Sequence, residues 1–188
     1  EPHRSIDPIV TGSHLVIQLQ QLVSRMIDPQ KPAVVHVGSV HSGSASNIIP
    51  ETMDIVGSVR TYEEETRTEI ENRIRQISTS VCESVGAACT VKYRRGYPSV
   101  WNDPIETKKV EATIQQVIGD QQVVRIAPLM IGEDFAYYTQ KIPGVFFFVG
   151  AGNKEINAKY PHHHSKFDAD ERSMLVTAKS FISLVSAD

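Results

Sequence analysis

The sequence predicts an α/β protein whose first part is an α+β unit of ferredoxin-like type. Three observations support this prediction. Residues 1–98 show helical and strand patterns in the order α-β-β-α-β, which is most of a βαββαβ unit. Turn-forming residues then concentrate at 96–104, where we expect a boundary. Beyond it, helical patterns alternate with runs that are apolar on both faces, as in an α/β layer whose sheet is covered on both sides.

The first helix is expected to begin at Asp7 and Pro8, because an N-cap aspartate followed by proline at the first helical position is a typical start. A helical stripe follows and stops at residues 28–29. It consists of Ile9, Gly12, Val16, Leu19, Val23 and Met26. Alternation of apolar and polar residues then predicts strands at 33–41 and 52–62.

A second helix is expected after a capping box of Thr61 and Glu64, with Gly86 as its C-terminal stop. Its apolar stripe is Ile70, Ile74, Ile77 and Val81. Alternation at 89–94 predicts a third strand. The opening strand of the βαββαβ unit has no counterpart, and the chain has no initiator methionine, so we expect that strand upstream of Glu1.

In the second part, a helix is expected from Asp103 and a short helix with acidic residues in its first turn at 132–141. The run "VFFFV" at 145–149 predicts a doubly buried strand, and "QVVRIA" is a shorter apolar run. A last helix is expected from Asp168, capped with Glu171. Its predicted inward face is Met174, Leu175, Ala178, Phe181, Ile182 and Val185. These strands are too few to close a layer, so we expect the other half elsewhere in a longer protein.

Composition excludes several classes of protein. The hydrophobic content of 40% and charged content of 22% are ordinary globular values and argue against disorder. A net charge of −3 gives no electrostatic reason to expect nucleic acid, and no apolar run reaches the length of a membrane span. Cys82 and Cys89 match no metal-binding spacing, so we interpret them as reduced thiols of a cytoplasmic protein.

Three consecutive histidines, His162, His163 and His164, lie between the run at 145–149 and the last helix. Loops at strand ends of open α/β sheets are where ligands bind. A metal site needs three or four ligands, however, and one cluster supplies one or two. A surface loop that happens to contain histidines explains this stretch equally well.

Three other features have ordinary explanations when each is taken alone. Glu133 and Asp134 suit the start of a helix, where acidic residues are stabilised by the helix dipole. The polar stretch at 41–51 is longer than a turn requires, but an ordinary surface loop accounts for it. Arg60 shares the polar face of its strand with Asp54, where most arginines are solvated and a minority bind carboxylates.

Four stretches of the sequence match motifs of one protein family, in the same order and at similar separations. They are "PHRSIDPIV", "SGSASNIIPETMDIVGSVRTY", "GEDFAYYTQKIPGVFFFVGAG" and "YPHHHSKFDADE". With them the sequence resembles the amidohydrolase branch of the metal-dependent aminoacylase/carboxypeptidase superfamily. That branch includes N-acyl-amino-acid amidohydrolases, hippurate hydrolases and hydrolases of indole-acetyl amino acid conjugates. The resemblance implies a zinc-peptidase-type α/β/α catalytic domain and an inserted lid. Residues 1–98 match the lid, which also forms the dimer, and residues 99–188 match the C-terminal part of the catalytic domain.

The resemblance also assigns a metal ligand. His163 stands four positions before the phenylalanine of "KFD", where the family has its C-terminal metal-ligand histidine. His162 and His164 occupy variable positions, and Ser165 replaces the family's proline. The family's other metal ligands and its general-base glutamate match nothing here, so no catalytic residue is expected in this chain.

The resemblance places substrate contacts at three further positions. Asn47 and Arg60, thirteen residues apart, match a substrate-contacting pair on the lid, and Gly132 matches a glycine of the substrate pocket.

The resemblance therefore predicts a metal-dependent hydrolase of the aminoacylase type, a metallopeptidase-like N-acyl-amino-acid amidohydrolase. It is expected to carry two zinc ions, or manganese or cobalt, and to form a homodimer through the lid. We expect the 188-residue chain alone to be inactive. The alternative is a stand-alone, non-catalytic dimerisation or binding module derived from the lid. An RNA-binding ferredoxin-like domain is disfavoured, because the first predicted strand lacks stacking aromatic residues.

Overall fold

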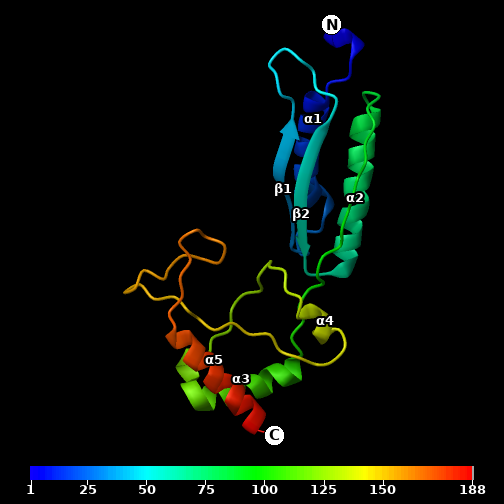
Figure 1. Ribbon diagram of the computed structural model, residues 1–188. Coiled ribbons are helices and arrows are strands. Elements are labelled where there is room, and N and C mark those ends of the chain that lie inside the picture. The colour runs from blue at the N-terminus through cyan, green and yellow to red at the C-terminus, as the bar shows by residue number, and fades with distance from the viewer. Residues whose placement is uncertain (188) are drawn as a thin grey trace. The chain divides into compact units, whose positions relative to one another are not determined.

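The computed structural model describes residues 1–187, which divide into two units (Figure 1). The first unit contains Glu1–Ser99 together with Leu129–Glu133. The second contains Val100–Pro128 and the chain from Asp134 onward. Within residues 1–187, no helix combines the length and the apolar composition that a membrane crossing requires.

The first unit is a β-hairpin covered on one face by helices (Figure 1). Strands β1 (Ala33–Ser42) and β2 (Met53–Thr61) pair antiparallel, with a one-residue irregularity between Val37 and Ser39. Helices α1 (Pro8–Gln21) and α2 (Glu64–Glu83) supply most of the core. Its buried members are Leu15, Leu19, Leu22, Ile27 and Ile70. Both strands lie close to their predicted positions.

Helix α1 begins as predicted, because Asp7 Oδ1 accepts hydrogen bonds from the backbone N–H groups of Ile9 and Val10. After α1 the chain continues in a π-helical turn at Leu22–Met26. The predicted apolar stripe is partly wrong. Ile9 and Met26 are exposed, while Leu15 and Leu22 are buried. The buried face is rotated because α1 meets the hairpin along Leu15 and Leu19 and approaches Met53 closely at Gly12.

Helix α2 confirms the predicted stripe, because Ile70 is fully buried and its i+4, i+7 and i+11 neighbours pack against the core. The capping box is wrong. Glu63 occupies the N-cap position without a side-chain cap, and the Thr61 hydroxyl donates to the Glu63 carbonyl instead. Gly86 has φ +75°, as expected of a left-handed residue that ends a helix.

The predicted third strand at 89–94 is not a strand, because within residues 1–187 the sheet contains only β1 and β2. The alternation itself is present. Val91 and Tyr93 are half-buried, whereas Lys92 and Arg94 are exposed. Alternation sets which side chains face inward, but a strand also needs a partner that supplies ladder hydrogen bonds.

Arginine side chains hold this extended segment against α2. Arg75 Nη1 donates to the Val91 carbonyl at 3.0 Å, and Arg67 Nη2 donates to the Gly96 carbonyl at 2.9 Å. Arg95 pairs with Glu64 and, at 2.9 Å, with Glu71. The guanidinium groups of Arg75 and Arg95 hold the pKa of Glu71 below its usual range. Side-chain contacts thus replace strand pairing here.

Gly57 is required by the close approach of the two strands. A Cβ added there would lie 2.4 Å from the His36 carbonyl oxygen. We expect Gly57→Ala to lower the free energy of unfolding by roughly 1–3 kcal/mol, because overpacking forces the backbone apart. Urea unfolding followed by circular dichroism measures the change. Gly96→Ala is the matched control, since an added Cβ meets nothing within 4 Å there. Equal midpoints for the two variants would contradict this account.

In the second unit, α3 (Pro104–Ile118) packs against α5 (Arg172–Ser186), and α4 is a single turn at Ala136–Thr139. Asp103 caps α3 as predicted, accepting hydrogen bonds from the Ile105 and Glu106 N–H groups. Short 3₁₀ turns lie at Pro2–Arg4 in the first unit and at Asp120–Gln122 in the second. The acidic residues Glu133 and Asp134 precede α4 and do not lie in its first turn, which corrects the prediction.

The run at 145–149 forms no strand, which corrects the prediction, and the shorter apolar run "QVVRIA" forms none either. The Asn102 side chain forms with the Phe146 backbone the two hydrogen bonds that a neighbouring strand would otherwise provide. Its Nδ2 donates to the Phe146 carbonyl and its Oδ1 accepts the Phe146 N–H, both at 2.8 Å. Phe148 is 48% exposed, so the segment is not buried on both faces. The prediction fails because no strand of residues 1–187 lies beside it.

Helix α5 begins at Arg172, four residues later than predicted, and Glu171 provides no side-chain cap. The predicted inward face is also wrong, because its large members are 56–78% exposed. They are Met174, Leu175, Phe181, Ile182 and Val185. Ser180 is the buried residue of this helix. The periodicity is genuine, but these side chains stay largely exposed among the described residues, although the Phe181 ring contacts that of Phe147.

Candidate functional site

The four predicted site residues are divided between the two units. Asn47, Arg60 and Gly132 belong to the first unit, because Leu129–Glu133 returns to it, and His163 belongs to the second. The structure therefore tests contacts among the first three and the local surroundings of the fourth.

Arg60 and Gly132 lie side by side although 72 residues separate them in the sequence. A Cβ added at Gly132 would lie 3.6 Å from Arg60 Nη1. Within residues 1–187, Arg60 forms no ion pair, so no carboxylate neutralises its guanidinium. Because glycine has no side chain, its backbone leaves one side of that cation uncovered. The pair can therefore accept an anionic group.

Tyr97 completes this cluster, although no pattern in the sequence predicts it as a site residue. Its Cδ2 atom would lie 3.6 Å from the same added Cβ at Gly132. The residues around Tyr97 are fixed to the first unit: Arg67 binds the Gly96 carbonyl, and the Ser99 hydroxyl donates to the carbonyls of residues 61 and 62. The tyrosine was overlooked because the turn-rich stretch around it predicts a boundary and carries no signal of a site.

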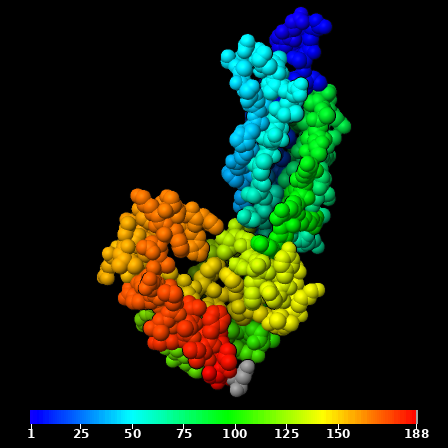
Figure 2. Space-filling view, viewed as in Figure 1, coloured from blue at the N-terminus to red at the C-terminus, as the bar shows by residue number. Residues whose placement is uncertain are grey.

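Asn47 is not brought to Arg60. It lies in the 43–52 loop beyond the Ser42–Met53 pair, whereas Arg60 pairs with Val34 near the other end of the hairpin. The eight steps from Val34 to Ser42 correspond to roughly 25 Å at the usual rise of a strand. Figure 2 shows this loop, in cyan, at one end of the first unit. Within one copy, Asn47 and Arg60 cannot contact the same small molecule.

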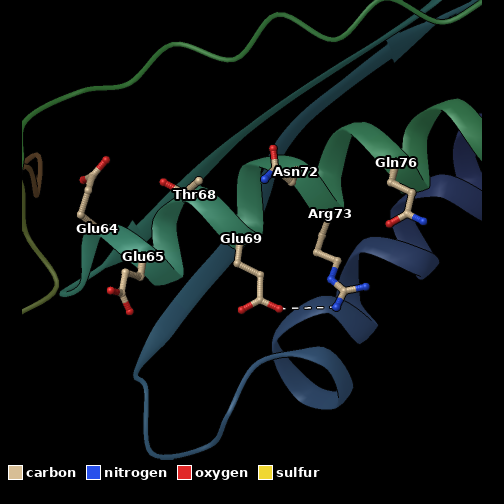
Figure 3. A pocket seen from close by; sticks show the side chains of 7 residues that line it. All are labelled: Glu64, Glu65, Thr68, Glu69, Asn72, Arg73 and Gln76. Atoms are coloured by element: carbon tan, nitrogen blue, oxygen red, sulfur yellow. Dashed lines mark hydrogen bonds and ion pairs between the residues drawn. The ribbon is translucent and has the colours of Figure 1, made fainter.

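A surface hollow of about 620 Å³ lies elsewhere, along the polar face of α2 (Figure 3). Its lining includes Glu64, Glu65 and the Glu69–Arg73 ion pair, all on one helix. It contains none of the predicted site residues. A row of solvated side chains on a single helix explains it, so we do not assign the site there.

The structure distinguishes the three consecutive histidines. The His164 ring stacks on Tyr160 with centroids 4.4 Å apart, and its Nδ1 accepts the Lys166 N–H at 3.0 Å. The His162 ring meets Phe167 edge to face at 5.0 Å. No such ring or hydrogen-bond contact holds the His163 imidazole within residues 1–187. His163 is therefore the member of the run whose imidazole makes neither a ring contact nor a side-chain hydrogen bond among the described residues.

The backbone of His163 is also unusual, with φ +67°. Residues other than glycine seldom adopt this left-handed conformation, although histidine tolerates it better than most. Such strained conformations concentrate at functional sites, where surrounding structure maintains them.

The loop that carries His163 is closed at its base. The Asp170 N–H donates to the Ala151 carbonyl at 2.8 Å, and the Asn153 side-chain amide donates to the Asp170 carboxylate at 2.7 Å. Arg172 also binds that carboxylate. The Arg172 guanidinium, with Arg172 N–H and Asn153, holds the pKa of Asp170 well below its usual range. This stabilisation is present above the ordinary carboxyl pKa and is lost as the pH falls through the lowered one.

A complete metal site is not formed by the described part of the chain. Within residues 1–187, no three histidine, cysteine, aspartate or glutamate side chains come close enough to hold an ion together. His163 fits the role of a single nitrogen donor, since its imidazole is exposed and makes no competing contact. A metal held by it would need two or three further ligands.

Comparisons with known proteins identify the family of the chain. The model of "Peptidase family M20/M25/M40" matches residues 4–187, and the chain belongs to this family. The resemblance drawn from the four sequence motifs is thereby confirmed.

Similar proteins include several hydrolases. YhaA of Bacillus subtilis (strain 168), named as an amidohydrolase, is 39% identical over 95% of this chain and 45% of its own length. The N-acetyl-L-cysteine deacetylase of the same organism is 34% identical over 93% of this chain and 40% of its own length. The N-acetyldiaminopimelate deacetylase of Brevibacillus brevis is 34% identical over 95% of this chain and 46% of its own length.

Two solved structures have the same fold. An aminohydrolase from methicillin-resistant Staphylococcus aureus, so named in its description, has a TM-score of 0.80 and 36% identity over 98% of this chain and 47% of its own. Bacillus subtilis YXEP, described as a dinuclear metal-binding peptidase of the M20 family, has a TM-score of 0.70 and 29% identity. It covers 95% of this chain and 45% of its own. The chain thus spans about half the length of its relatives and has their mixed α/β fold.

Proposed function

We propose that the protein containing this chain is a metal-dependent amidohydrolase that cleaves the amide bond of N-acyl amino acids. The observation that carries the proposal is the unneutralised Arg60 guanidinium beside the bare backbone of Gly132. N-acyl amino acids keep a free carboxylate, and a guanidinium binds a carboxylate through two parallel hydrogen bonds. The names of the two deacetylases, both for N-acetylated amino acids, support the same substrate class.

Each residue then has a defined role. The Arg60 guanidinium binds the substrate carboxylate, and Gly132 keeps that approach open. His163 provides one nitrogen ligand to a two-metal site of zinc, manganese or cobalt. When bound, such metals polarise the amide carbonyl and lower the pKa of a water molecule. The remaining ligands and the general base would come from the rest of the protein, so the 188-residue chain alone should be inactive.

The two units have separate roles in this proposal. Residues 1–98 would form the lid and the homodimer contact, and residues 99–188 would be the C-terminal part of the catalytic domain. Asn47 lies roughly 25 Å along the hairpin from Arg60, a distance that a small substrate cannot span. Asn47 would therefore contact a substrate bound by Arg60 of a second copy.

The proposal is tested by assaying the full-length protein with a panel of N-acyl amino acids and detecting the released amine. We expect hydrolysis that is lost on metal chelation and restored by zinc, manganese or cobalt. The matched controls are the same compounds with the carboxylate amidated. Full-length protein that contains metal but hydrolyses none of the acids would overturn the proposal, and the lid-derived binding module would then be favoured.

A further inference from the structure

Tyr97 presents a half-exposed aromatic ring beside Arg60 and Gly132. The residue is 53% exposed. Its Cδ2 atom and Arg60 Nη1 each lie 3.6 Å from one point, the position of a Cβ added at Gly132. The two atoms are therefore separated by no more than twice that distance. An aromatic surface and a cation thus border the same bare backbone, and all three residues belong to the first unit.

The backbone next to Tyr97 is bound to the end of β2. The Ser99 hydroxyl is shared between the Thr61 carbonyl at 3.1 Å and the Tyr62 carbonyl at 2.7 Å. Thr61 directly follows Arg60 in the sequence. These hydrogen bonds therefore hold the segment that carries the tyrosine ring close to the residue that carries the guanidinium. The fold of the first unit thus maintains the pair.

The separation of these two side chains suits one acyl amino acid. A charge-assisted hydrogen bond spans about 2.7–2.9 Å, and a contact between carbon atoms spans about 3.5–4.0 Å. A molecule whose carboxylate binds Arg60 can therefore also touch the Tyr97 ring with a group attached to its α-carbon. That carbon carries two such groups, the acylated nitrogen and the amino-acid side chain. In the proposed function the scissile amide faces the metals, which leaves the side chain for the ring.

We propose that Tyr97 determines which amino acid is released, because its ring packs against the side chain of the substrate's amino acid. This inference rests on the proposed function, in which Arg60 binds the substrate carboxylate. Aromatic rings pair favourably with other rings, and large apolar side chains remove more surface from water than small ones. Glycine has no side chain to cover the ring. The favoured substrates are therefore N-acyl derivatives of large apolar or aromatic amino acids.

The test compares kcat/KM of the full-length protein on N-acetylphenylalanine and on N-acetylglycine. The wild type should prefer the phenylalanine compound, and Tyr97→Ala should lower the ratio of the two values roughly 10-fold or more. Tyr97→Phe is the matched control, because it keeps the ring, and it should retain the ratio. Equal fractional losses on both compounds in Tyr97→Ala would assign the ring a structural role and overturn the proposal.

Failure of this inference can be distinguished from failure of the proposed function. A wild type that hydrolyses both compounds but prefers N-acetylglycine would overturn the role of Tyr97 alone, even if a variant fails to fold. If neither compound is hydrolysed, the proposed function fails, and calorimetric binding of N-acetylphenylalanine to the full-length protein becomes the measurement. Binding weakened by Tyr97→Ala but not by Tyr97→Phe would support the contact. Absent binding, or equal binding in all three proteins, would overturn it.

Discussion

Replacing His163 by alanine in the full-length protein should remove bound metal and most of kcat. The imidazole of His163 is the one in its run without a ring or hydrogen-bond contact, and it sits on a left-handed residue. Loss of a direct ligand leaves the ion short of the three or four donors it needs. Metal content by elemental analysis is the primary measurement, with kcat on an N-acyl amino acid as the second.

His162→Ala and His164→Ala are the matched controls, because they differ from His163→Ala only in position. Their rings contact Phe167 and Tyr160, so we expect them to support the loop and not to bind the ion. Losses of supporting contacts around a metal commonly reduce affinity or activity about 10–100-fold. If His164→Ala lost the most metal, or if all three variants lost the same amount, the assignment of His163 would be wrong.

Arg60→Lys should reduce kcat/KM on an N-acyl amino acid and largely spare the same compound with its carboxylate amidated. Lysine keeps the positive charge but cannot form two parallel hydrogen bonds. Loss of a charge-assisted pair in a closed site removes roughly 2–5 kcal/mol of binding free energy. That range corresponds to roughly 30-fold to several-thousand-fold in kcat/KM. The measurement is the ratio of kcat/KM on the acid to kcat/KM on the amide, compared between the parent and the variant.

Arg94→Lys is the control for this substitution, since Arg94 is an exposed arginine of the same unit. It should change neither substrate appreciably, because surface substitutions away from special contacts are usually within about 0.5 kcal/mol. Equal fractional losses on acid and amide in Arg60→Lys would assign Arg60 a structural role and withdraw it from substrate binding.

Local signals in the sequence were sufficient where the stabilising partner is only a few residues away. Asp7 and Asp103 cap their helices as predicted, and Gly86 takes the left-handed conformation expected of a helix end. The capping boxes at Thr61 and Asp168 fail because a side chain that can cap a helix can also bind other nearby groups. Thr61 binds the Glu63 carbonyl, and the helix expected from Asp168 begins four residues later.

Predictions that depended on a partner far away in the sequence were less often correct. The stretches at 89–94 and 145–149 have strand-like patterns, but no ladder within residues 1–187 includes them. Periodicity along α5 correctly groups Phe181 and Ile182 on one face, yet it contains no information about what covers that face. Burial depends on the neighbouring element, which a pattern along one segment does not specify.

The candidate site shows the same difference between local signals and contacts of residues far apart in the sequence. Residue types alone left Arg60 and the histidine run with ordinary explanations, and the family resemblance singled out His163. The structure then placed Arg60 beside Gly132, a contact between residues far apart in the chain. Tyr97 could be found only from that contact, because nothing in its own sequence neighbourhood distinguishes it from other turn residues.

The first unit is held together by apolar burial and by ion pairs, and these two kinds of interaction respond oppositely to salt. Its helices and hairpin are joined by apolar burial around Leu22 and Ile70, which sulfate and similar excluded salts strengthen. The stretch after Gly86 is joined in part through Arg95, whose ion pairs with Glu64 and Glu71 of α2 are screened as ionic strength rises. Concentrated sulfate would therefore tighten the core while loosening this stretch from α2.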